Sequence, residues 1–92
     1  MKRLEFSRRA NADLERILDY FRQVAPDSMS RIAADIDDAL GSIIEAPEMY
    51  AKVDRKNYRR YVSHRYRFKI AYRVSRDTVA IIGIYRFQNR TA

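Results

Sequence analysis

Residues 58–74 read YRRYVSHRYRFKIAYRV and combine side chains that suit an anionic ligand. The stretch holds four tyrosines, six Arg/Lys residues and one histidine, and it contains no acid. Clustered cations can neutralise phosphates or stabilise the charge of a phosphoryl transition state without a metal, and tyrosine rings can stack on bases. An acidic, amphipathic protein segment laid across such strands would use the same charges, and the sequence alone leaves both partners open.

The alternation of residue types divides this stretch into two faces, because successive side chains of a strand point to opposite sides of a sheet. One face is basic: Arg65, Arg67, Lys69 and Arg73, joined by Arg59 or Arg60 from the preceding strand. The other face is aromatic or aliphatic: Tyr66, Phe68, Ile70 and Tyr72. We expect the second set to pack in the core and the basic set to face an anionic partner.

The sequence holds few residues that could support other kinds of chemistry. Asp54 and Asp77 are the only acids in residues 51–92, and both fall in expected turns, so a pair of catalytic carboxylates is not expected there. One histidine and no cysteine give no metal-ligand pattern, and two glycines do not make a phosphate-binding loop. We therefore expect no metal and no cofactor, and we interpret His64 as an exposed turn residue.

The first half of the chain predicts a strand followed by two helices. Residues 2–6 alternate as a short strand, Ser7 can cap the helix that follows, and Pro26 stops that helix. A second amphipathic helix runs to Pro47. The acids of both helices, Asp13 and Asp35 among them, are expected on the outer sides.

The second half predicts three strands at about residues 58–62, 66–74 and 78–86. The order β-α-α-β-β-β indicates an α+β fold, with an N-terminal strand, an α-helical hairpin and a three-stranded antiparallel sheet. The last strand is apolar on both faces. We expect one of its two sets of side chains to remain partly exposed and to need a partner. The two sets are Ala80, Ile82 and Ile84, or Val79, Ile81 and Tyr85.

Size and charge limit the class of protein further. The 92 residues suffice for a single domain, residues 1–92. Residues 1–50 carry 7 Lys/Arg and 10 Asp/Glu, whereas residues 51–92 carry 12 and 2, so the net charge of +7 is concentrated in the strands. Without cysteine, and without an apolar run of about 18 residues, we expect a cytoplasmic protein that does not contact membranes.

The chain resembles the RelE/ParE superfamily of bacterial type II toxins. The matching stretches are FSRRANADLERILDYF at 6–21, IIEAPEMY at 43–50, YRRYV at 58–62 and KIAYRVSRDTVAIIGI at 69–84. Together they span nearly the whole chain in the expected order. The first helix and the YRRY…YRV strands look more like the ParE branch than like RelE.

The resemblance implies a toxin that a cognate, ParD-like antitoxin neutralises with an acidic, amphipathic C-terminal segment. ParE-like toxins poison DNA gyrase, so the resemblance favours gyrase as the target, inhibited by binding and without catalysis. The residues expected to contact the antitoxin are Leu14, Ile17, Arg65, Arg67, Lys69, Arg73, Ile82 and Ile84. Those expected to contact the target are Arg86, Phe87 and Arg90.

Two alternatives remain. RelE-like toxins cut mRNA in the ribosomal A site, and such a ribosome-dependent endonuclease would use Arg60, Arg65, Lys69, Arg86 and Arg90 for phosphate and transition-state charge. That set is incomplete, because a lysine stands where the family has a strand arginine, no tyrosine follows Arg86, and no acid–base residue is assigned. The second alternative is a non-toxic remnant or binding module with the same fold.

Overall fold

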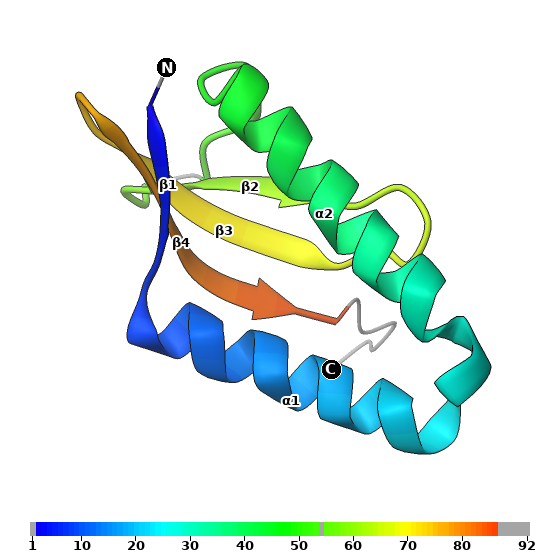
Figure 1. The fold of residues 1–92 in the computed structure, drawn as a ribbon. Coiled ribbons are helices and arrows are strands. Elements are labelled where there is room, and N and C mark those ends of the chain that lie inside the picture. The colour runs from blue at the N-terminus through cyan, green and yellow to red at the C-terminus, as the bar shows by residue number, and fades with distance from the viewer. Residues whose placement is uncertain (1, 54, 87–92) are drawn as a thin grey trace.

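A computed structural model describes residues 2–53 and 55–86 (Figure 1). In chain order the elements are β1 (Arg3–Phe6), α1 (Arg8–Val24), the 3-10 turn η1 (Pro26–Ser28), α2 (Met29–Glu45), β2 (Arg59–Val62), β3 (Lys69–Val74) and β4 (Thr78–Tyr85). The order β-α-α-β-β-β and the α+β class are as predicted.

The two helices begin and end where local chemistry places them. Ser7 caps α1, since its hydroxyl oxygen accepts the backbone N–H of Ala10 at 3.0 Å. Pro26 follows the end of α1 and opens η1, where its missing N–H costs no helical hydrogen bond. The helix α2 ends at Glu45, shortly before Pro47.

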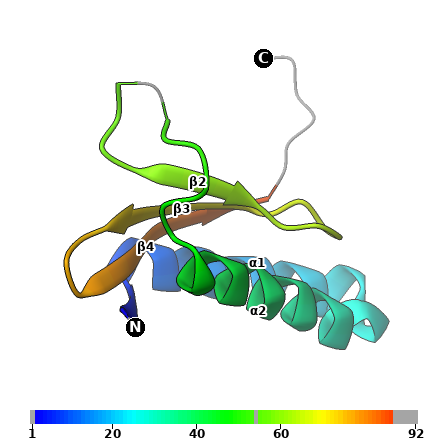
Figure 2. The same cartoon turned by 90° about the horizontal axis from the view of Figure 1, so that it is seen from above.

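Both helices cover the same face of the sheet, and the core lies between them and the strands (Figure 2). α1 lies along β4, and α2 reaches toward β2. Every third or fourth residue of α2 is buried, as expected of an amphipathic helix: Ile32, Ile36, Ala39 and Ile43. On the strands the buried set includes Ile70, Tyr72 and Ile81, so the expected core face of β3 is confirmed.

The sheet has four strands in the order β1-β4-β3-β2, one more than the three-stranded antiparallel sheet predicted. The additional strand is β1, which pairs with β4 in parallel. The other pairs, β4 with β3 and β3 with β2, are antiparallel. β4 is therefore a central strand with a neighbour on each side, although the helices cover only one of its faces.

A β-bulge in β4 reverses the alternation of its side chains. Ala71 pairs with Gly83, whereas Tyr72 pairs with Ile81, so Ile82 is the additional residue. Val79, Ile81 and Ile84 consequently share the helix-covered face, and Ile84 is only 2% exposed. Neither of the two predicted sets is therefore exposed as a set: Ile84 is buried and does not share a face with Ala80 and Ile82, and Val79 and Ile81 are buried although Tyr85 is exposed. Ile82 itself is half-buried.

The loop between β2 and β3 is folded around a buried carboxylate. Asp35 of α2 accepts the hydroxyl of Ser63 at 2.6 Å and the backbone N–H groups of Arg65 and Tyr66 at 3.0 and 2.9 Å. Arg67 has a φ of 63°, which ends the extended chain before Lys69. β3 therefore starts at Lys69 and not at residue 66, and Asp35 is buried and not on the outer side of α2 as predicted.

Burial of Asp35 opposes ionisation of its carboxyl group. The hydrogen bonds from Ser63, Tyr66 and Arg65, with the charge of Arg65, outweigh that effect and hold the pKa of Asp35 below its usual value. The ionised carboxylate of Asp35 is thus the form that accepts the three hydrogen bonds of the loop.

Replacing Asp35 with Ala is expected to lower the free energy of unfolding by about 3 kcal/mol, because the Ser63 hydroxyl and two backbone N–H groups lose their acceptor. Acid should act similarly on the wild type. Because the folded-state pKa of Asp35 lies below the unfolded value of 3.8, its contribution is complete at neutral pH and is lost as the pH falls below that value. Urea unfolding at several pH values measures both effects.

The matched control is Asp37→Ala, which removes an exposed acid from the same helix and should change the free energy of unfolding by less than about 0.5 kcal/mol. The stabilising role of Asp35 is contradicted if Asp35→Ala has the same urea midpoint of unfolding as the wild type. It is also contradicted if the variant loses stability in acid as steeply as the wild type.

Candidate functional site: a basic cleft on the open face of the sheet

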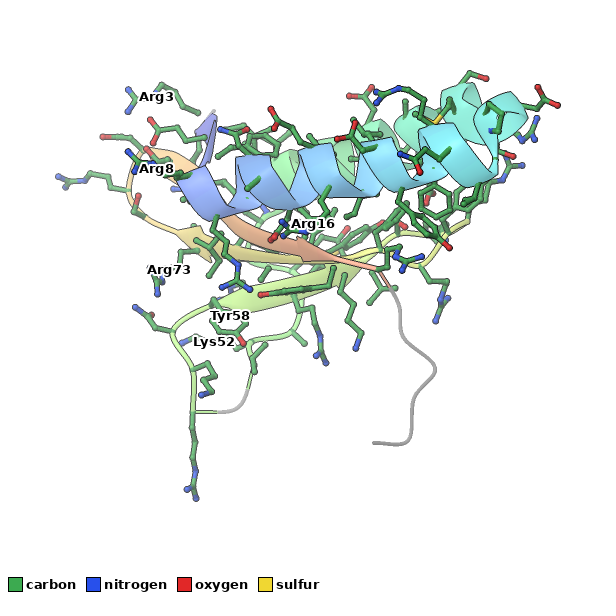
Figure 3. The ribbon with its side chains drawn as sticks, turned by 90° about the horizontal axis from the view of Figure 1, so that it is seen from below. Arg3, Arg8, Arg16, Lys52, Tyr58 and Arg73 are labelled. Carbon is green, nitrogen blue, oxygen red and sulfur yellow. The ribbon has the colours of Figure 1, made fainter. Side chains whose placement is uncertain are left out.

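The face of the sheet opposite the helices carries a cleft of about 310 Å³, here called the sheet-face cleft. It is lined by Tyr58, Arg60, Lys69, Ala71, Tyr85 and Arg86. Figure 3 shows Tyr58 and Arg73 on this side of the sheet, away from α1. Three lining residues are cationic and two are tyrosines, and none is acidic.

Strand register brings the lining residues together. Lys69 pairs with Tyr85 across β3 and β4, and Arg60 pairs with Ala71 across β2 and β3. Side chains paired directly across strands point to the same face of a sheet, so residues far apart in the sequence surround one point. The floor is low because Ala71 is small and its partner on β4 is Gly83.

Gly83 also allows Tyr85 to fold back over the sheet. A Cβ atom at Gly83 would lie 2.7 Å from the Tyr85 hydroxyl oxygen and 3.1 Å from its ring carbon Cζ, so the ring occupies the space that a side chain would need. Gly83 is buried on this face although the helices lie on the other. Tyr85, at 44% exposure, forms the wall of the cleft.

Arg86 follows β4 and is held by aromatic rings of α1. Its guanidinium carbon lies 4.1 Å from the ring centroid of Tyr20 and 5.8 Å from that of Phe21. These are cation–π distances, so the rings hold the guanidinium group at the end of the cleft. Arg86 thus connects the sheet-face cleft to α1.

Neighbouring polar groups are occupied in the fold. Arg59 donates to the Tyr50 carbonyl oxygen at 2.7 Å, and Arg73 donates to the Asn57 carbonyl oxygen at 3.1 Å. Tyr72 donates its hydroxyl to the carbonyl oxygen of Pro47 at 2.6 Å. Burial raises the pKa of Tyr72 to about 12, against the opposing charge of Arg59, so this tyrosine is unsuited to proton transfer near neutral pH.

Residues 2–53 and 55–86 contain no group of three or more His, Cys, Asp or Glu side chains placed to hold a metal ion. Among the same residues, no helix is long and apolar enough to cross a membrane. His64 is exposed, in agreement with its interpretation as a turn residue.

The structure brings together part of the predicted basic set. Arg60, Lys69 and Arg86 line one cleft, whereas Arg65 and Arg67 lie in the loop that Asp35 holds and do not line it. The prediction that these two arginines project from β3 is wrong, because the strand begins after them.

The remaining predicted residues are spread over the molecule. Leu14 is half-buried in a shallow apolar groove between α1 and α2, and Ile17 is only 6% exposed. Arg73 is exposed on the open face. Phe87 and Arg90 lie outside the described residues.

Sequence reasoning missed the two tyrosine walls and the small floor of the cleft. The sequence pattern places Tyr58 only in a strand, and it makes Tyr85 an alternative member of an apolar set. Their common position follows from strand register and the bulge, which the sequence does not reveal. Gly83 was the available signal, because a glycine inside a strand often marks a bulge or a close approach.

The fold matches solved structures that define its class. A chain of the "Chromosomal ParDE TA system from P. aeruginosa" superposes with a TM-score of 0.79 at 23% identity, covering 96% of this chain and 98% of that chain. The intact E. coli RelBE toxin–antitoxin complex gives 0.60 at 14% identity, covering 97% and 100%. The solution structure of HP0894 from Helicobacter pylori gives 0.56 at 13%, covering 94% of each chain. The fold is therefore of the RelE/ParE type.

The sequence comparison is more specific. The family described as the ParE toxin of the type II toxin–antitoxin system parDE matches residues 4–91, nearly the whole chain. The chain belongs to this family, and the resemblance seen in the sequence is confirmed. No curated protein sequence matches it significantly.

Substitution of each of the two glycines tests the position of the Tyr85 ring separately from the stability of the fold. Gly83→Ala is expected to displace the Tyr85 ring while changing the free energy of unfolding by less than about 1 kcal/mol, because the clash is with the end of a flexible side chain. The ring resonances of Tyr85 in NMR spectra report its displacement.

Gly41→Ala is the control, since nothing lies within 4 Å of its new Cβ in α2. It should stabilise the protein by about 1 kcal/mol through helix propensity and leave the Tyr85 resonances unchanged. Unshifted Tyr85 resonances in Gly83→Ala would refute the described packing of the ring over this glycine.

Proposed function

We propose that this chain is a toxin that inhibits DNA gyrase by binding it through the sheet-face cleft and Arg86. The supporting observation is the composition of the cleft: Arg60, Lys69 and Arg86 surround it with Tyr58 and Tyr85, and no acidic residue lines it. Such a site attracts an anionic or polar surface, and exposed Tyr and Arg side chains often dominate binding energy. It has no assigned group for proton transfer, which favours binding over catalysis. Phe87 and Arg90 belong to the same proposed contact.

A cognate antitoxin is part of the proposal. The ParDE and RelBE systems that share the fold are toxin–antitoxin systems by name. For this chain we propose a ParD-like partner whose acidic, amphipathic C-terminal segment pairs with Lys69 and Arg73, contacts Ile82, and reaches Leu14 in the groove between the helices. Arg65 and Arg67 can add charge from the loop. Ile17 and Ile84 are buried and support the surface from beneath.

One observation supports a second candidate function, a RelE-like ribosome-dependent mRNA endonuclease. Arg60, Lys69 and Arg86 belong to the predicted nuclease set, and they line the same cleft. Three converging cations can stabilise the charge that develops when a phosphodiester is cleaved. The cleft lacks an assigned acid or base, so this candidate ranks second.

Purified protein is expected to inhibit supercoiling by gyrase or to trap a gyrase–DNA cleavage complex. Arg86→Ala and Tyr85→Ala should each raise the concentration needed for inhibition roughly tenfold or more, because they remove a cationic and an aromatic anchor of the proposed contact. Arg76→Ala is the matched control, since it removes an exposed arginine from the turn before β4, and it should inhibit like the wild type.

Unchanged supercoiling with no trapped complex would contradict gyrase as the target. If induced expression instead cuts mRNA at specific codon positions, and the double variant Lys69→Ala/Arg86→Ala stops it, the endonuclease is correct. Normal growth of cells that contain folded protein would identify a non-toxic binding module.

A further inference from the structure

A second cleft lies between α1 and the end of β4, and we call it the α1–β4 cleft. Its volume is about 360 Å³, within the usual range of small-molecule sites. It shares Tyr85 and Arg86 with the sheet-face cleft, but its other wall is formed by α1. Figure 3 shows Arg16 on the side of α1 that faces β4. The proposed inhibition of gyrase gives the α1–β4 cleft no ligand.

Positive charge in this cleft exceeds negative charge. Arg9, Arg16 and Arg86 line it, and Asp13 is the one acid among its described lining residues. Asp13 accepts a hydrogen bond from Arg16 at 2.6 Å and one from the backbone N–H of Ile84 at 3.1 Å. Arg9 also forms an ion pair with Asp13, with its Nε 3.8 Å from a carboxylate oxygen.

Asp13 is therefore largely engaged by the protein itself. Its single negative charge can offset only one of the three arginines, so the cleft keeps a net positive charge. The side chains of Arg9 and Arg16 are 68% and 70% exposed, so their remaining N–H donors are open to a bound anion. Guanidinium groups pair well with phosphate, because they present several donors in one plane.

Aromatic rings accompany these cations. Tyr20 and Tyr85 are 43% and 44% exposed, and both line the cleft. Arg86 already lies against the Tyr20 ring, and the Arg9 guanidinium lies 6.0 Å from the Tyr85 centroid. Base stacking on aromatic and guanidinium planes is a major source of affinity for nucleotides. An acidic peptide would use the arginines but would gain little from these exposed ring faces.

We propose that the α1–β4 cleft binds a nucleotide unit, with its phosphate between Arg9 and Arg16 and its base stacked against Tyr20 or Tyr85. The unit is either a free nucleotide or one residue of a single-stranded nucleic acid, since both present the same phosphate and base. This function goes beyond inhibition of gyrase. The two proposals share Tyr85 and Arg86, but the phosphate position depends on Arg9 and Arg16 of α1, which do not line the sheet-face cleft.

The test is an NMR titration of the full chain with adenosine monophosphate, adenosine, inorganic phosphate and a short single-stranded oligodeoxynucleotide. The monophosphate should shift resonances of Arg9, Tyr20 and Arg86 and bind at least about tenfold more tightly than phosphate or adenosine alone. Tighter binding of the oligonucleotide would identify a nucleic-acid strand as the source. Equal or weaker binding would identify a free nucleotide.

Two variants on α1 test the roles of ring and charge separately. Tyr20→Leu and Arg9→Gln should each weaken binding of the monophosphate by about fivefold or more, and Arg9→Gln should also reduce its dependence on salt. Arg8→Gln is the control, because it removes the same charge from the neighbouring exposed position outside the cleft. All three positions are exposed, so these proteins should fold like the wild type.

Several results would overturn the proposal. They are an absence of binding at millimolar nucleotide, equal affinity for phosphate and the monophosphate, or equal losses in Arg8→Gln and Arg9→Gln. Tighter binding of an acidic peptide at the same resonances, unaffected by Tyr20→Leu, would also overturn it. None of these results bears on supercoiling by gyrase, so the two proposals fail independently.

Discussion

The carboxylate of Asp13 joins α1 to the end of β4, and the arrangement of both clefts depends on that contact. Beyond Ile81, the edge of β4 has passed the end of β1, so the backbone N–H of Ile84 has no strand partner on that side. Asp13, at 3% exposure, accepts this N–H and so satisfies a group whose burial alone would be costly. Tyr85 and Arg86 follow directly and are thereby held between helix and sheet.

The two faces of the sheet have separate roles because strand geometry separates them. One face packs Ile70, Tyr72 and Ile81 against the helices and provides the core. The other carries Arg60 and Lys69 around a floor of small residues, and it is the face that we propose binds the target. The bulge at Ile82 makes both roles possible in β4, because it returns Ile84 to the core while leaving Tyr85 on the open face.

Local patterns predicted those parts of the fold that depend on local chemistry. The cap at Ser7, the helix break at Pro26 and the buried face of β3 follow from propensity and period. The parallel pairing of β1, the bulge and the buried acids Asp13 and Asp35 do not. Each of these features depends on a partner distant in sequence. The partner of Asp13, for example, is the backbone N–H of Ile84, and without knowledge of that partner the sequence pattern of the helix makes Asp13 look like an ordinary exposed acid. The same limit explains why only part of the basic set was placed correctly.

The most direct test of the account is photo-crosslinking from position 85, with a photoreactive aromatic residue in place of Tyr85. In cells that express this variant, we predict a crosslink to a gyrase subunit, which co-expression of the antitoxin should remove. The same residue at position 38, on the exposed side of α2, should give no gyrase crosslink. Crosslinks from position 85 to ribosomal proteins or mRNA, with none to gyrase, would contradict the account.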